Sequence, residues 1–315
     1  MKKIPVIAVV GPTASGKTAL SIEIAKLYNA EIVSCDSMQI YKGMDIATAK
    51  PDKLEMQGIA HHLMSEVDRT CDFSVSMYKE LAQNRISEII SRKKNVVIVG
   101  GTGLYVQSLL YNIEYIEAPK NEEIRKQLEN KAQELGTHTL LDELMAIDEQ
   151  TANKLHTNDK SRIIRALEIY YTSGKTMSEQ VESSRKNPSP YNFCIIGLDF
   201  KDRQKLYDRI NKRVDIMIEN GLIEETKQYM TEEHKATANQ AIGCKEMSEF
   251  LNGSATLKEA TEKLKMETRR YAKRQLTWFR KEPKVNWLYV DETDCFSNLL
   301  KKACEIINKS EILEG

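Results

Sequence analysis

The sequence predicts an α/β protein in which helices flank a parallel β-sheet and a helical domain is inserted into the chain. Short apolar runs typical of buried strands alternate with amphipathic runs typical of helices in the N-terminal and C-terminal parts of the sequence. From about residue 119 to residue 185 the sequence is instead charged, helical in pattern and poor in β-branched runs. We therefore expect a core formed by residues 1–116 and 192–315, with a helical insertion domain at 117–191.

The composition sets limits on the class of protein. The 46 Lys and Arg residues balance 46 Asp and Glu residues, so any affinity for nucleic acid must come from local basic patches. The six cysteines lie far apart without a C-x-x-C pair, which argues against a disulfide framework and against a zinc site. The sequence shows neither a signal peptide nor a stretch long enough to span a membrane. We expect a cytoplasmic protein with no membrane partner, and we expect a monomer.

The first apolar run, residues 4–10, ends in a glycine-rich turn with the spacing G-x-x-x-x-G-K-T, and an amphipathic run follows. This strand, loop and helix order is the context of a phosphate-binding P-loop. Backbone N–H groups of such a loop surround phosphate oxygens, the lysine neutralises the outer phosphate and the last hydroxyl ligates Mg²⁺. We expect Mg²⁺ as cofactor, with Thr18 as its ligand. The predicted diphosphate-binding residues are Gly11, Pro12, Thr13, Ala14, Ser15, Gly16, Lys17 and Thr18.

Two further strands are predicted to end beside this loop. Residues 31–35 lead into Asp36, which should face the same crevice as Lys17, because ligands bind at the carboxyl ends of strands in doubly wound sheets. The position alone equally suits a turn or a helix cap. Residues 95–99 lead into a glycine pair and Thr102, where a P-loop hydrolase would carry an acidic partner for Mg²⁺. Close approach of the backbone to a ligand and tight helix packing both remain open for these glycines.

Basic residues stand out in three places. Lys160 and Arg162 begin a helix of the insertion, where either a solvated face or a phosphate contact would explain them. Arg203 and Arg209 open the helix after the strand at 194–200 and could close over a diphosphate. Residues 263–284 combine many cations with interleaved aromatic rings, a pattern that favours nucleic-acid binding, although an amphipathic structural helix is the alternative.

Six segments of the sequence form a distinctive series. In chain order they are Gly-Pro-Thr-Ala-Ser-Gly-Lys-Thr (11–18), Asp-Ser-Met-Gln-Ile-Tyr (36–41), Gly-Gly-Thr-Gly-Leu-Tyr (100–105), Gly-Leu-Ile-Glu-Glu (221–225), Ala-Ile-Gly-Cys-Lys-Glu (241–246) and Arg-Arg-Tyr-Ala-Lys-Arg-Gln (269–275). In this order they resemble the tRNA dimethylallyltransferase family in its bacterial form. The resemblance covers residues 4 to about 290, with Cys244 at a usual tyrosine position and Ala60 at a frequent proline position.

The resemblance implies a prenyl transferase that modifies tRNA. The P-loop would hold dimethylallyl diphosphate, and the acceptor would be N6 of the adenosine immediately 3′ of the anticodon. Asp36 would take the proton from N6, Thr102 would orient the substrates, and Lys17, Arg203 and Arg209 would stabilise the leaving diphosphate. The implied contacts to the tRNA anticodon stem-loop are Asp36, Ser37, Met38, Gln39, Thr102, Lys160, Ser161, Arg162, Ile163, Ile164, Arg269, Arg270, Lys273 and Arg274.

Other functions fit the same loop. A small-molecule or nucleoside kinase would bind ATP there and use Lys17 and Asp36 for phosphoryl transfer. An isopentenyltransferase acting on free adenine nucleotides and a non-catalytic RNA-binding NTP switch are further alternatives. The glycine pair at 100–101 and the basic aromatic helix disfavour the kinase.

Overall fold

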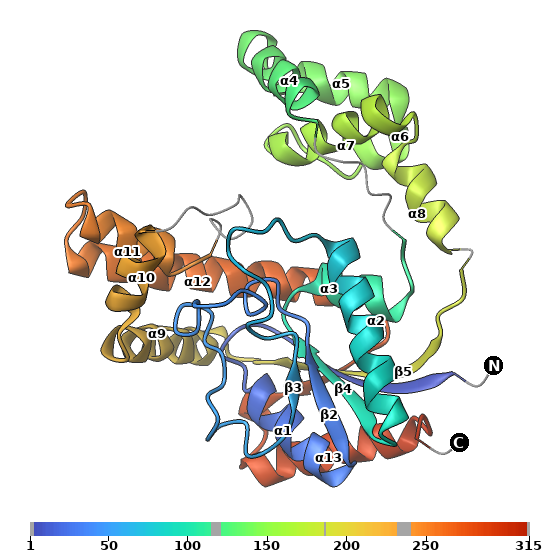
Figure 1. Ribbon diagram of the computed structural model, residues 1–315, viewed down its shortest axis with the longest axis vertical. Helices are drawn as coiled ribbons and strands as arrows, with labels where there is room; N and C mark the ends of the chain where they lie inside the picture. The colour runs from blue at the N-terminus through green and yellow to red at the C-terminus, as the bar shows by residue number, and fades with distance from the viewer. Residues whose placement is uncertain (1–2, 115–120, 186, 232–240, 314–315) are drawn as a thin grey trace. The chain divides into compact units, whose positions relative to one another are not determined.

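The computed structural model describes residues 3–114, 121–185, 187–231 and 241–313. The chain divides into two compact units, drawn in Figure 1, and each is described by itself. The first unit comprises Met1–Leu110 and Pro190–Gly315, and the second comprises Tyr111–Ser189. The bounds of the second unit differ by a few residues from the 117–191 expected for the insertion.

The first unit is built on one six-stranded sheet in which every pair of neighbouring strands is parallel. The described strands confirm the predicted α/β class, with β1 between β4 and β5 at the centre of the sheet. The sequence did not predict the short edge strand β3, where His62 Nε2 lies 2.7 Å from Glu31 of β2. In sheet order the strands are β3 (His61–His62), β2 (Ala30–Ser34), β4 (Asn95–Gly100), β1 (Ile4–Val10), β5 (Tyr191–Asp199) and β6 (Val285–Tyr289).

Helices cover both faces of this sheet. On one face, alternate residues of β1, Ile7 and Val9, pack with Leu20 of α1 and Ala303 of α13 in one buried cluster. The residues between them, such as Ala8, are buried against the other face, where α2 and α3 contact each other and α2 contacts β4. The bounds are α1 (Lys17–Leu27), α2 (Val75–Ser91), α3 (Gly103–Leu110) and α13 (Phe296–Lys309).

Four more helices of the first unit pack together beyond the carboxyl edge of the sheet. A buried cluster joins Val214 of α9, Leu222 of α10, Met247 of α11 and Leu264 of α12. The long helix α12 begins with a capping box, in which Thr256 and Glu259 satisfy each other's backbone N–H groups. The bounds are α9 (Arg203–Glu219), α10 (Leu222–Met230), α11 (Cys244–Leu251) and α12 (Leu257–Phe279).

The second unit is helical and has a hydrophobic core of its own. Leu128, Leu140, Leu144 and Leu167 meet in this core, as one apolar stripe from each of three helices. Its helices are α4 (Glu122–Leu135), α5 (Thr137–Ile147), α6 (Glu149–Ala152), α7 (Lys160–Ser173) and α8 (Met177–Arg185). Among the helices of the described ranges, none has the length and apolar character that crossing a membrane requires.

Candidate active site

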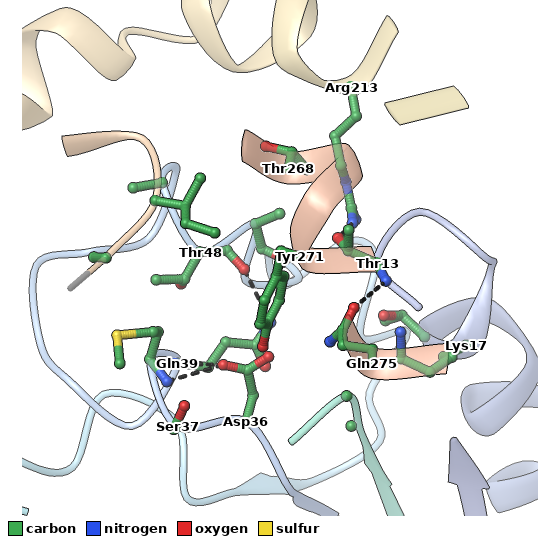
Figure 2. A pocket seen from close by; sticks show the side chains of 18 of the residues that line it. Thr13, Lys17, Asp36, Ser37, Gln39, Thr48, Arg213, Thr268, Tyr271 and Gln275 are labelled. Carbon is green, nitrogen blue, oxygen red and sulfur yellow. Dashed lines mark hydrogen bonds between the residues drawn. The ribbon is translucent and has the colours of Figure 1, made fainter. Parts of the chain in front are cut away.

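A cavity of about 370 Å³ opens at the carboxyl ends of β1, β2 and β4. Figure 2 shows that its side chains come from parts of the first unit that are far apart in the sequence. The P-loop contributes Thr13, Lys17 and Thr18; the turn after β2 contributes Asp36, Ser37, Met38 and Gln39; β4 contributes Gly100; α9 contributes Arg213; α12 contributes Tyr271, Arg274 and Gln275.

The P-loop takes its shape from two glycines and from a contact with α12. Gly11 has φ 142°, and a Cβ there would lie 2.5 Å from the carbonyl oxygen of Leu198 in the neighbouring strand. Gly16 has φ 94° and caps the start of α1. The N–H of Thr13 donates to Gln275 Oε1 at 2.8 Å. This bond connects the loop to α12, since Gln275 lies 262 residues after Thr13 in the sequence.

Two cations, Lys17 and Arg213, line the cavity beside the loop. Burial, reinforced by the positive charge of Arg213, lowers the pKa of Lys17 to about 7, although Asp36 opposes this shift. Burial also lowers the pKa of Arg213 from its usual value. An anionic group bound between them would relieve both effects, so this end of the cavity is suited to a diphosphate.

Asp36 occupies the place that the sequence predicted, and it also caps its own turn. Its Oδ1 accepts the N–H of Met38 at 2.9 Å and the N–H of Gln39 at 3.3 Å. These bonds fix the direction of the carboxylate, which lines the same cavity as Lys17. Thr102 stands behind this turn, where its Oγ1 accepts the N–H of Ser37 at 3.1 Å. Asp36 therefore both stabilises the turn after β2 and lines the cavity.

The arginines of α9 differ in what they contact. The Arg203 guanidinium donates to the buried carboxylate of Asp199 at 3.2 Å. Arg209 does reach the loop, and its Nε donates to the carbonyl oxygen of Ala14 at 2.8 Å. The sequence analysis missed Arg213, which donates to Thr13 Oγ1 at 3.2 Å. The four-residue spacing between Arg209 and Arg213 places both on one helical face and is the signal that could have found it.

The glycines at the end of β4 and directly after it pack closely against other parts of the first unit. A Cβ on Gly101 would lie 1.9 Å from Gln275 Nε2, and a Cβ on Gly103 would lie 2.1 Å from Trp278 Cδ1. Gly100, whose Cβ would lie 2.2 Å from the carbonyl oxygen of Cys35, also lines the cavity. Tight packing of α12 is therefore observed in this segment, and Gly100 and Gly101 line the cavity, where close approach to a ligand stays a prediction.

The basic helix α12 turns its cations in different directions. Arg274 lines the cavity and stacks over the ring of Tyr271, with 5.7 Å between the guanidinium carbon and the ring centre. Arg269 donates to Asn211 of α9 at 2.6 Å, whereas Arg270 pairs with Glu267 at 2.7 Å on the exposed side. Lys273 is exposed. Arg269 is therefore engaged within the protein, and the other three are accessible.

Tyr271 and Gln275 are site residues that the sequence analysis did not assign. Burial, followed by the nearby negative charge of Asp36, raises the pKa of Tyr271 above its usual value, so its hydroxyl stays protonated. Both residues line the cavity in Figure 2. Their spacing of four residues marks one face of α12 and could have indicated them.

In the second unit, the predicted contacts of α7 divide into two groups. Ser161 and Arg162 are exposed near the start of the helix, where Lys160 is half-buried. Ile163 and Ile164 are buried in the core of the unit, with exposed fractions of 0% and 2%. The helical period turns these two side chains inward. Contact of Ile163 and Ile164 with RNA stays a prediction, and it would involve their backbone.

The comparison with known proteins decides the family. The family model described as IPP transferase matches residues 39–282. The chain belongs to the IPP transferase family. It is 50% identical over 298 residues to the tRNA dimethylallyltransferase of Acetivibrio thermocellus, covering 94% of this chain and 95% of that protein. It is 49% identical over 286 residues to that of Bacillus subtilis, covering 90% of each.

Solved structures of this family share the fold of the chain. The tRNA isopentenylpyrophosphate transferase of Bacillus halodurans matches with a TM-score of 0.73 at 41% identity, covering 99% of this chain and 98% of that one. A eukaryotic dimethylallyltransferase captured acting on tRNA matches with a TM-score of 0.77 at 28% identity, covering 97% and 80%. The fold is that of a P-loop NTPase-like core.

Proposed function

We propose that this protein transfers a dimethylallyl group from dimethylallyl diphosphate to N6 of the adenosine immediately 3′ of the tRNA anticodon. The products are N6-isopentenyladenosine in tRNA and diphosphate. One observation carries the proposal: residues of the P-loop, two half-buried cations and a carboxylate line one cavity. The similar proteins are named tRNA dimethylallyltransferase, which supports this reaction over the kinase and free-nucleotide alternatives.

The loop end of the cavity would bind the diphosphate of the donor. Backbone N–H groups of the loop, Lys17 and Arg213 surround the space that the phosphate oxygens would take, and Arg209 supports the loop from outside. Negative charge grows on the diphosphate as the bond between C1 and oxygen breaks. Fixed cations therefore stabilise the transition state more than the ground state.

The carboxylate of Asp36 would activate the acceptor. The lone pair of an exocyclic adenine amine is delocalised into the ring, so N6 is a weak nucleophile. Asp36 would accept a hydrogen bond from N6, and then its proton, as the bond from N6 to C1 forms. The diphosphate leaves with the electron pair of the broken bond. The two turn N–H groups that bind Asp36 Oδ1 keep its direction fixed during this transfer.

Magnesium fits the residues of the loop end. Thr18 lines the cavity directly after Lys17, and a hydroxyl together with diphosphate oxygens and water is a donor set that Mg²⁺ accepts. We infer that Thr18 holds the ion. When bound, the ion would neutralise part of the diphosphate charge, which is a Lewis-acid contribution to its departure.

The acceptor base must leave the stack of the anticodon loop to enter the cavity. Tyr271 and Arg274 stand at the cavity with a ring and a cation, which are the groups that contact unpaired bases and phosphates. We infer that Arg270, Lys273, Lys160 and Arg162 contact the RNA backbone, because they are cations at accessible positions. We further infer that the protein acts as a monomer in the cytoplasm.

The direct test uses purified protein, Mg²⁺ and an unmodified anticodon stem-loop with consecutive adenosines. With dimethylallyl diphosphate the RNA should gain the mass of one dimethylallyl group, and with ATP it should gain nothing. Lys17→Ala should abolish the gain, since the loop loses the cation that contacts the diphosphate. Phosphate transfer from ATP without prenylation would support the kinase instead.

A further inference from the structure

A turn in the cavity wall is held by one carboxylate from a distant helix. Glu225 of α10 accepts three consecutive backbone N–H groups of this turn. Its Oε2 receives the N–H of Asp45 at 2.7 Å and that of Ile46 at 2.8 Å, and its Oε1 receives the N–H of Ala47 at 2.8 Å. Bonds of this kind to a charged acceptor are stronger than those between neutral groups. The turn belongs to no helix or strand, so Glu225 is its main anchor on this side.

The same turn is joined to the carboxylate of the proposed reaction from its other side. Ala47, Thr48 and Ala49 line the cavity. The Gln39 side chain donates to the carbonyl oxygens of Thr48 at 3.2 Å and Ala49 at 3.4 Å, and Gln39 N–H donates to Asp36. Figure 2 shows Gln39 between Thr48 and Asp36. Hydrogen bonds at both ends of the turn, joined by its backbone and by Gln39, therefore connect Glu225 to Asp36.

Two helices begin against this turn. α10 begins after Gly221 and α11 begins after Gly243, with φ values of 99° and 109°. A Cβ on Gly243 would lie 3.3 Å from Ala47 Cβ, and one on Gly221 would lie 3.8 Å from Ile46 Cδ1. The turn therefore packs closely against the starts of α10 and α11, and the carboxylate of Glu225 fixes the backbone of the turn in this position.

We propose that Glu225 is a positioning residue of the prenyl-transfer site, holding the wall at residues 47–49 and, through Gln39, the turn that carries Asp36. The proposal rests on the proposed function for the reaction that it would affect. The diphosphate itself is bound elsewhere, by the P-loop, Lys17 and Arg213. Removing Glu225 should therefore impair transfer without weakening the affinity for diphosphate.

The neighbouring residue Glu224 supplies a matched control. It lies on the same helix, but its side chain is 67% exposed, and its Oε1 lies 3.4 Å from Lys227 Nζ. Glu224→Gln removes the same charge without touching the turn. Glu225→Gln keeps the size of the side chain and one acceptor oxygen, whereas Glu225→Ala removes both oxygens. A positioning carboxylate should give a small loss of transfer activity in Glu225→Gln, a larger loss in Glu225→Ala and no loss in Glu224→Gln.

Two measurements on these variants test the proposal. Hydrogen exchange should show the amides of residues 45–47 exchanging roughly tenfold or more faster in Glu225→Ala, with unchanged protection in β1. In the transfer assay kcat/KM should fall roughly tenfold or more in Glu225→Ala and by less in Glu225→Gln. The dissociation constant of inorganic diphosphate should stay within about threefold of the parent protein, and Glu224→Gln should behave as the parent.

Each contrary result has a distinct meaning. Unchanged transfer in a folded Glu225→Ala protein overturns the proposal, as does unchanged exchange at residues 45–47. A parallel loss of diphosphate affinity also overturns it, because the residue would then support the whole unit. If Glu225→Ala does not fold, the comparison of Glu225→Gln with Glu224→Gln decides. A parent protein that binds diphosphate but never prenylates RNA would refute the proposed function, while the exchange experiment would still report on the anchor.

Discussion

The loop end of the cavity and the start of α7 in the second unit use cations in opposite ways. In the cavity, Lys17 and Arg213 are half-buried. Burial lowers the pKa of each, and the charge of Arg213 lowers the pKa of Lys17 further. On α7, Arg162 is exposed and pairs only loosely with Asp159, at 3.6 Å. Buried cations act at fixed positions in a medium of low polarity, whereas exposed ones act through screened attraction. Substitutions at the loop end of the cavity should therefore change the reaction rate strongly. Substitutions at the start of α7 should change RNA binding weakly.

The largest effect is expected at Asp36. Asp36→Asn keeps an oxygen that can cap the turn but removes the base, so kcat should fall by roughly 10²-fold or more. RNA affinity should change by only a few-fold. Single-turnover rates with a bound stem-loop measure the step directly. Near-normal turnover would remove Asp36 from the mechanism and would weaken the contrast between the two regions.

The two arginines at 203 and 213 provide the next test. Arg213→Ala removes a charged donor from the loop end and should weaken diphosphate binding by roughly 10- to 100-fold. Arg203→Ala should leave that affinity within a few-fold, because the Arg203 guanidinium is engaged by Asp199, which also keeps Arg280 at 2.8 Å. Calorimetric titration with inorganic diphosphate compares them. The reverse order of effects would support the role that the sequence suggested for Arg203.

The pKa of Lys17 predicts how donor binding depends on pH. With a pKa of about 7 in the free protein, Lys17 is largely neutral above pH 7, whereas a bound diphosphate favours its charged form. Binding above pH 7 should therefore take up a proton, and affinity should fall by up to about tenfold per pH unit. Below pH 7 this group should add no pH dependence.

Calorimetry in buffers of different ionisation enthalpy measures this proton uptake. Lys17→Arg is the control, because an arginine stays charged throughout. The same ligand titrates identically in both proteins, so the difference between them isolates Lys17. Equal uptake by the two proteins at pH 8 would show that the lysine is already charged before binding.

The smallest effects are expected from single exposed cations. Alanine at Lys273, Arg270 or Arg162 should each remove about one phosphate contact and reduce the slope of log K against log salt by roughly 0.7 to 0.9. Arg269→Ala should leave the slope unchanged, since that guanidinium binds Asn211. Binding of the stem-loop across a salt series sorts these positions. If none changes the slope, the RNA contacts lie elsewhere.

The sequence predicted well those features that are contiguous along the chain. The P-loop and the strand ends that carry Asp36 and Gly100 were found because a motif or an apolar run marks each one. Arg213 and Gln275 were missed because they meet Thr13 only after folding, across 200 and 262 residues. The burial of the Ile163 and Ile164 side chains was not predicted, because a matching segment does not reveal which side of a helix faces the core.

The edge strand β3 and the anchor at Glu225 were hidden for a similar reason. Two residues are too few for a strand pattern, and β3 exists because Ile32 and Val33 of β2 provide its pairing partners. Glu225 looks like an ordinary exposed residue of an acidic helix start until the turn at 45–47 is folded against it. Contacts of this kind depend on the whole fold and leave no local pattern.

The central claim is that this cavity prenylates the adenosine next to the tRNA anticodon, and the modified nucleoside itself is the most direct measurement. Bulk tRNA from cells that lack the protein should contain no N6-isopentenyladenosine, including any further modified form of it, when digested nucleosides are analysed by mass spectrometry. The parent protein should restore it, and Asp36→Asn should not. An unchanged content of this nucleoside in cells without the protein would contradict the account.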